Sequence, residues 1–191
     1  TPEYSSAASD VYKRQVGHWN LAQLANAIYP VVGNVEPLQE ALDEYEAIFA
    51  RSWSDMVAAK LGLVEHSSDP SQRVITDLFS ILETGEIDMT IFFRSLSSIT
   101  VGSNINIDEI TALLKSAYYE HESKPQVHWE SLRSWIEHYC DVLRNQGVTD
   151  EQRRAQMNQV NPKYVLRNYL AQLAIDSAEQ GLSLIHISEP T

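Results

Sequence analysis

The side chains best suited to bind a metal ion gather in one stretch of the sequence: His121, Glu122, His128, His138 and Cys140. A zinc site needs imidazole and thiolate ligands that converge on one ion at about 2 Å. His138 and Cys140 are two positions apart, so on a helix they face different directions. Pro125 also interrupts the path from His121 to His128. The spacing therefore favours structural or solvated roles for these residues, and we predict no metal site.

Cys140 is the single cysteine of the chain. A disulfide framework or a Cys-based zinc finger requires several thiols, so the sequence excludes both. We expect no Lys or Arg near Cys140 that would lower the pKa of its thiol. The residue is interpreted as a small buried apolar side chain or a half-exposed thiol.

Other ionisable residues have ordinary structural explanations. Five carboxylates fall on polar helix faces or in first helical turns, where the helix dipole favours acidic residues; they are Asp43, Glu44, Glu46, Asp108 and Glu109. Arg94 and Arg167 each lie among apolar residues near the middle of a predicted helix. For these two arginines we expect a structural ion pair or an interdomain contact rather than a catalytic role.

Common catalytic motifs are absent from the sequence. It contains no Gly-rich phosphate loop, no nucleophile elbow and no paired-His metalloprotease helix. The Tyr and Trp residues at helical spacing are interpreted as core. We therefore predict no catalytic, cofactor-binding or metal-binding residue in this chain.

Helices must position these residues, because apolar side chains recur every three or four positions along the chain. The spacing predicts a short helix from Trp19 to Tyr29, stopped by Pro30, and a long helix from Pro37 to about Gly62. Further helices are expected within residues 74–85, 88–96, 106–117 and 129–147, after residue 149, and within 161–181. No alternating strand pattern or fixed-period repeat is present. The predicted fold class is all-α, with about seven or eight helices.

Residues typical of helix ends support this reading. Asp88 is a predicted N-cap, Asn106 with Glu109 a capping pair, and Thr149 with Gln152 a capping box. The last helix is expected to open with Asn161 as its cap and Pro162 at its first position.

Composition restricts the classes of function. The chain has 191 residues, 14 Lys and Arg against 26 Asp and Glu, and a net charge of −12. This acidity disfavours nucleic-acid binding, which needs clustered basic residues. No apolar run approaches the roughly 20 residues that span a bilayer. We expect a soluble cytoplasmic protein with one domain.

The two ends of the chain differ in character from the sequence between them. Residues 10–15 read DVYKRQ and residues 182–187 read LSLIHI. Reversing the first peptide and complementing one permitted codon for each residue yields the second peptide at every position. Such a pair is expected from an inverted repeat that flanks an insert, and it resembles translated sequencing-adapter DNA. We therefore predict that residues 1–15 and 182–191 are disordered artefacts and that residues 16–181 are the protein proper.

Four segments carry a resemblance to a known family. They are NPKYVLRNYLAQ at residues 161–172, VGHWNL at residues 16–21, KLGL at residues 60–63, and DMT with FRSL at residues 88–96. In order and spacing they resemble the selenoprotein O family, SelO, also called YdiU. The likeness covers residues 16–181 and is weakest at residues 101–124.

The resemblance implies that the whole protein is a kinase-like protein adenylyltransferase, which uses ATP and magnesium to transfer AMP to Ser, Thr or Tyr hydroxyls of proteins. The family's catalytic parts precede the position of Val16, so none is carried onto a residue of this chain. Residues 16–181 would then be an inactive helical C-terminal portion that packs against the missing kinase-like lobe. Alone, it is expected to expose apolar surface and to be marginally stable. The alternative is a self-standing acidic helical interaction module without catalysis.

Overall fold

The computed structural model describes residues 6–102 and 105–179, with side chains from residue 15 onward. These residues form eight α-helices and one 3₁₀ turn and contain no β-strand, which confirms the predicted all-α class. The helices are α1 (Ser6–Val32), α2 (Glu36–Leu61), α3 (Asp69–Gly85), α4 (Met89–Leu96), α5 (Ile107–Lys115), α6 (Gln126–Asn145), α7 (Asp150–Val160) and α8 (Asn168–Glu179), with the 3₁₀ turn η1 (His121–Ser123) between α5 and α6.

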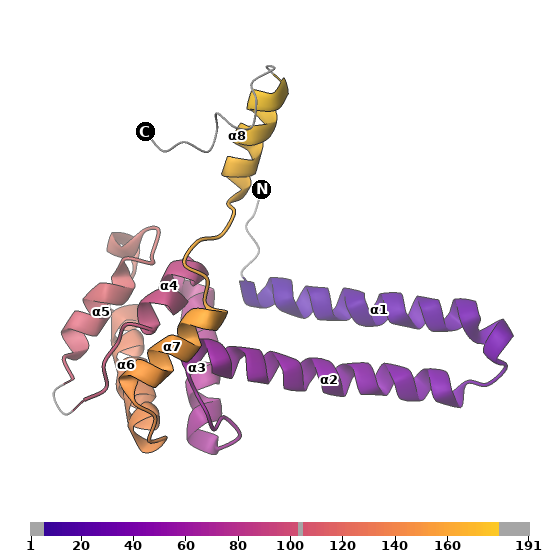
Figure 1. Cartoon of the computed structure of the whole chain (residues 1–191), viewed down its shortest axis with the longest axis horizontal. Coiled ribbons are helices and arrows are strands. Elements are labelled where there is room, and N and C mark those ends of the chain that lie inside the picture. The colour runs from indigo at the N-terminus through magenta and orange to yellow at the C-terminus, as the bar shows by residue number, and fades with distance from the viewer. Residues whose placement is uncertain (1–5, 103–104, 180–191) are drawn as a thin grey trace.

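Helices α1 and α2 form a long antiparallel hairpin that projects from the rest of the molecule (Figure 1). Helix α1 is longer than the sequence predicts: Pro30 lies inside its last turn, and the helix continues to Val32. Residues 6–15, which we predict to be disordered, belong to α1 in the structure, while residues 1–5 and 182–191 lie outside the described residues. The adapter origin of the two end segments stays a prediction.

The C-terminal end of α2 enters a compact group of helices that also contains α3 to α7, here called the head (Figure 1). Its centre holds Trp135 and Tyr139 of α6, whose rings stack with centroids 5.0 Å apart. The polar atoms of both rings have partners: Trp135 Nε1 donates to the carbonyl of Val74 at 2.8 Å, and the Tyr139 hydroxyl donates to the carbonyl of Leu61 at 2.6 Å. The core therefore buries aromatic side chains without leaving these polar groups unpaired.

Most of the predicted helix ends are confirmed. Asp88 caps α4 by accepting from the backbone N–H of Ile91 at 3.1 Å. Asn106 caps α5, and Thr149 with Gln152 forms the predicted capping box of α7. Gly62 ends α2 in the left-handed conformation, with φ 69°. These signals act within a few residues, so the sequence alone reveals them.

The last predicted helix is wrong in its first turns. Residues 161–167, here called the strap, are not helical, and α8 begins only at Asn168. The residue preceding a proline is biased away from the helical region, and Asn161 has φ −102° and ψ 102°. Helix α8 then projects from the head (Figure 1). None of the described helices combines the length and apolarity that crossing a bilayer requires.

Candidate functional site

The start of the strap is fixed by Asn161, which is buried in the head. Its side-chain amide donates to the carbonyl of Lys60 at 2.8 Å, and its Oδ1 accepts from Lys60 Nζ at 3.5 Å. Because this oxygen faces Lys60, it is not offered to the backbone N–H groups that an N-cap would serve. Burial lowers the pKa of Lys60. Asn161 thus joins the end of α2 to the end of α7.

Arg94 of α4 fixes the same point from the other side. Its guanidinium donates to the carbonyl of Asn158 at 3.3 Å and to that of Asn161 at 3.0 Å. Ser97 adds a hydrogen bond to the side chain of Asn158 at 2.9 Å. Among the described residues Arg94 forms no ion pair, because its partners are backbone carbonyls at the end of α7, and the alternative of an interdomain contact stays a prediction.

The far end of the strap is held by an ion pair. Arg167 lies 2.6 Å from the Oδ2 atom of Asp88, whose Oδ1 caps α4. The side chain of Asp88 is almost fully buried, whereas that of Arg167 is about one third exposed. The structural ion pair predicted for Arg167 is confirmed. One carboxylate therefore serves both the N-terminus of α4 and the last residue of the strap.

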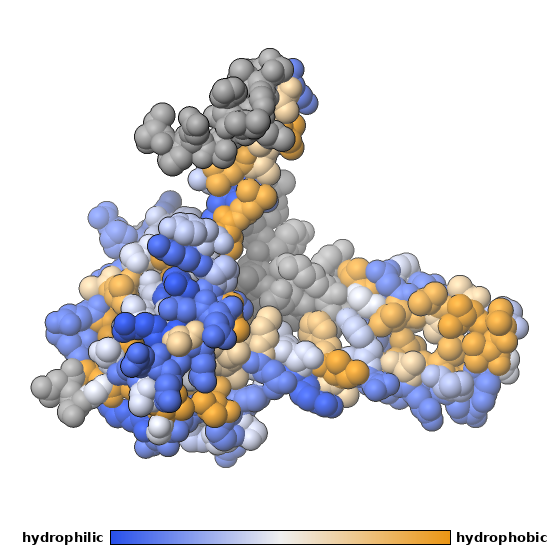
Figure 2. All heavy atoms as spheres, in the orientation of Figure 1, coloured by the Kyte–Doolittle hydropathy of each residue, from blue (hydrophilic) through white to orange (hydrophobic). Residues whose placement is uncertain are grey.

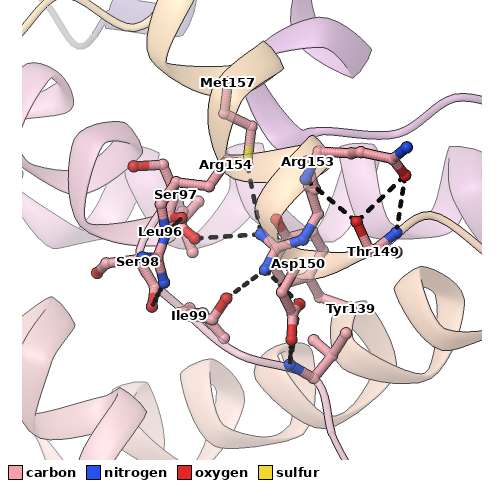
Figure 3. Close-up of polar contacts among 12 residues, drawn as sticks. Leu96, Ser97, Ser98, Ile99, Tyr139, Thr149, Asp150, Arg153, Arg154 and Met157 are labelled. Atoms are coloured by element: carbon pink, nitrogen blue, oxygen red, sulfur yellow. Dashed lines mark hydrogen bonds and ion pairs between the residues drawn. The ribbon is translucent and has the colours of Figure 1, made fainter.

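Two further arginines, which the sequence pattern does not single out, hold α7 against the C-terminal end of α4 (Figure 3). Arg153 donates to the carbonyls of Leu96 and Ile99 and lies 2.9 Å from Asp150. Arg154 donates to the carbonyls of Ser97 and Ser98, each at 3.3 Å. Cations placed here satisfy carbonyls that a helix end leaves unpaired and interact favourably with the helix dipole.

The burial of Arg153 could have been suspected from its surroundings in the sequence. Helix α7 is polar along most of its length, with Met157 as its one fully buried apolar side chain. It can pack closely only by burying the aliphatic stem of an arginine. Asp150, three residues before Arg153, supplies the counter-charge, and its carboxylate also accepts from the backbone N–H of Val101.

The predicted histidine, glutamate and cysteine candidates are separated by the fold. His121 and Glu122 lie in η1, whereas His128 is buried in α6, 2.8 Å from the hydroxyl of Tyr118. His138 lines a pocket between α3 and α6. No three His, Cys, Asp or Glu side chains in the described part of the chain form a group that could hold a metal ion.

Cys140 is buried in the head, and burial raises the pKa of its thiol to about 11. Arg144 and Arg153 act in the opposite direction, so the expectation that no basic residue lies near Cys140 is wrong. Desolvation outweighs both arginines. The thiol is therefore kept protonated and unreactive.

The five carboxylate candidates are on exposed positions of α2 and of the first turn of α5. Asp43 accepts from Gln39, Glu46 lies 3.8 Å from His18, Asp108 pairs with Arg133, and Glu109 accepts from Asn106. These are the contacts of a solvated helix surface, and they do not converge on a common point.

Comparison of the sequence with known proteins identifies the family of the chain. Residues 2–188 match the family model described as protein adenylyltransferase SelO. The chain belongs to the SelO family. Relatives named protein nucleotidyltransferase YdiU occur in Aromatoleum aromaticum, 43% identical over 185 residues, and in Rhodopirellula baltica, 38% identical over 193 residues. Each match covers 95% of this chain but only 34% and 36% of the respective relative. A relative in Flavobacterium johnsoniae is 40% identical over 166 residues, which are 87% of this chain and 31% of that protein.

The chain thus spans about a third of the length of the curated relatives it matches. Three of the four segments that resemble SelO meet at the strap: KLGL contributes Lys60, the segment at residues 88–96 contributes Asp88 and Arg94, and the segment at residues 161–172 contributes Asn161 and Arg167. In this chain the SelO-like segments build a joint between helices.

Proposed function

We propose that the whole protein transfers AMP from ATP to Ser, Thr or Tyr hydroxyls of proteins, with magnesium and within a kinase-like fold. This chain would contribute the helical part that supports that fold, without catalysing the reaction itself. The match to the adenylyltransferase SelO model along residues 2–188 carries the proposal. The relatives, which bear the name nucleotidyltransferase, agree with it. Cytoplasmic location stays a prediction from composition.

The chemistry of the described residues supports a structural role for this part. Nucleotidyl transfer needs cations that clamp the phosphates, carboxylate or amide ligands for magnesium, and a residue that orients the accepting hydroxyl. Arg94 donates to backbone carbonyls and Arg167 pairs with Asp88. The acidic and histidine side chains do not form a ligand group in the described ranges, so they do not fit a magnesium site. These residues would therefore support the fold of the enzyme and take no part in the reaction itself.

A chimera tests the proposed function. The matched region of the Aromatoleum aromaticum relative would be replaced by this chain, and the product incubated with α-³²P-labelled or γ-³²P-labelled ATP and bacterial proteins. We expect label to enter proteins from the α-labelled nucleotide only. Label from γ-labelled ATP would indicate kinase activity and would contradict the proposal. A folded chimera that transfers no label, beside an active parent enzyme, would also contradict it.

A further inference from the structure

Lys60, in the last turn of α2, is a half-buried lysine whose charge has little compensation. Its Nζ donates one hydrogen bond, to Oδ1 of Asn161 at 3.5 Å, and lies 5.4 Å from the centroid of the Phe93 ring. None of the ion pairs among the described residues includes Lys60. An ammonium group has three donors, so the head satisfies only part of the hydrogen-bonding capacity of this side chain.

Two other lysines show how the environment of Lys60 differs. Lys124 forms an ion pair with Glu86 at 2.8 Å, and Lys163 is exposed to solvent on the strap. Burial instead lowers the pKa of Lys60, because an ammonium group loses solvation when it is taken out of water. At a given pH, a larger fraction of Lys60 is therefore the neutral amine than of an ordinary exposed lysine.

The neutral amine is the nucleophilic form of lysine, and desolvation is one of the ways in which proteins activate it. Because Lys60 is only half-buried, a small reagent can still reach its Nζ atom. Arg94 lies at the same joint, where it donates to the backbone carbonyl of Asn161 at 3.0 Å, and it too belongs to none of the described ion pairs. A reagent that carries negative charge would therefore meet a cation close to the amine.

We propose that Lys60 is a site of acylation by acyl phosphates, a class of small, anionic, activated acids. The lone pair of Nζ forms a bond to the carbonyl carbon, the bond between this carbon and the phosphate oxygen breaks, and inorganic phosphate leaves with the electron pair. The proton lost from the nitrogen passes to solvent. The product is a neutral amide, and the reaction needs no other co-reactant.

Acylation would change the joint between α2 and the strap. The modified side chain loses its charge and with it the attraction to the Phe93 ring. The hydrogen bond from the Asn161 side chain to the backbone carbonyl of Lys60 does not involve the modified atom. We therefore expect acylation to weaken the attachment of the strap without releasing it.

Peptide mass spectrometry after incubation of the chain with acetyl phosphate at about pH 8 tests the proposal. Lys60 should be acetylated at least about threefold faster than the exposed control Lys163. Each unit by which a pKa falls raises the neutral fraction about tenfold, and partial burial of the amine offsets part of this gain. Acetylation of Lys60 at the same rate as Lys163, or more slowly, would overturn the proposal.

Two controls separate the effect of the fold from that of the local sequence and of the reagent. In guanidinium chloride the two lysines should react at equal rates, and a preference for Lys60 that persists in the unfolded chain would contradict the proposal. The uncharged reagent N-hydroxysuccinimidyl acetate should favour Lys60 less strongly than acetyl phosphate does. An equal preference with both reagents would contradict the selection of an anionic donor. Neither measurement requires AMP transfer, so both are independent of the proposed function.

Discussion

At the scale of single residues, the unusual feature is a fully buried arginine. Arg153 is 1% exposed, and its Nε is, among the described residues, a buried donor without a partner. Its other nitrogen atoms bind two carbonyls and Asp150. Burying a charge is costly unless it is paired, and removing one member of a buried pair is more costly than the pair itself is stabilising.

Arg153→Met should therefore lower the free energy of unfolding by about 3 kcal/mol, because it leaves Asp150 and the carbonyls at the end of α4 without their donor. Arg133→Met is the matched control: Arg133 pairs with Asp108 on the surface with 39% of its side chain exposed, so its loss should cost less than about 1 kcal/mol. Urea denaturation followed by circular dichroism measures both. An equal loss of unfolding free energy in the two variants would contradict the expectation that the buried Arg153 stabilises the fold more than the exposed Arg133 does.

Cys140 predicts a specific pH dependence. Burial raises the pKa of its thiol from 9.0 to about 11, so the folded state binds the proton more tightly than the unfolded state. This contribution to stability is complete below pH 9 and is lost as the pH rises towards 11. Between pH 9 and 11 the free energy of unfolding should therefore fall more steeply in the natural chain than in Cys140→Ala. Parallel slopes for the two proteins would contradict the raised pKa.

At the scale of elements, helix ends with local signals were predictable and the strap was not. Asp88 and Thr149 act on N–H groups at most three residues away, so their roles are visible in the sequence. Asn161 has the same appearance, an Asn before a Pro, but its side chain binds Lys60, 101 residues earlier in the chain. A partner at that distance carries no local signature. The carbonyl partners of Arg94, more than 60 residues away in the chain, escaped prediction for the same reason.

Gly62, at the end of α2, should tolerate no side chain. It has φ 69°, and a Cβ atom would lie 2.7 Å from Cγ of Arg153 and 2.9 Å from the sulfur of Met157. Gly62→Ala should destabilise the chain by about 3 kcal/mol, from backbone strain and overpacking together. Gly147 has φ 68° but nothing within 4 Å of the added atom, so Gly147→Ala should cost only the backbone part, about 1 kcal/mol. Thermal unfolding of both variants measures the difference, and similar melting temperatures would contradict the close packing of α7 on Gly62.

The attachment of the strap's C-terminal end can be tested through the Asp88–Arg167 pair. Asp88→Asn keeps an oxygen that can cap α4, and Arg167→Met keeps most of the side-chain volume. In a double-mutant cycle we expect a coupling free energy of about 1 kcal/mol, reduced by the partial exposure of Arg167. The exposed pair Arg144–Asp141 serves as control and should couple by less than about 0.5 kcal/mol. A coupling near zero for Asp88 and Arg167 would mean that the strap is not held there.

At the scale of the whole molecule, the chain combines a head with its own core and two projecting parts that carry exposed apolar side chains (Figure 2). The helical class followed from apolar periodicity, because that signal is summed over many residues. The projection of α8 could not be predicted, since it depends on where the strap is anchored. Family membership rests on the sequence match, whereas the geometry shows what the SelO-like segments do in this part of the protein: they join α2, α4 and α7 to the strap.

We propose that this chain supports the enzyme without contributing groups to nucleotide chemistry. Isothermal titration of magnesium-ATP into the isolated chain tests this proposal. We expect no saturable binding up to a nucleotide concentration of about 1 mM. One-to-one binding with a Kd of about 100 μM or tighter would contradict it, because the chain would then hold the nucleotide by itself.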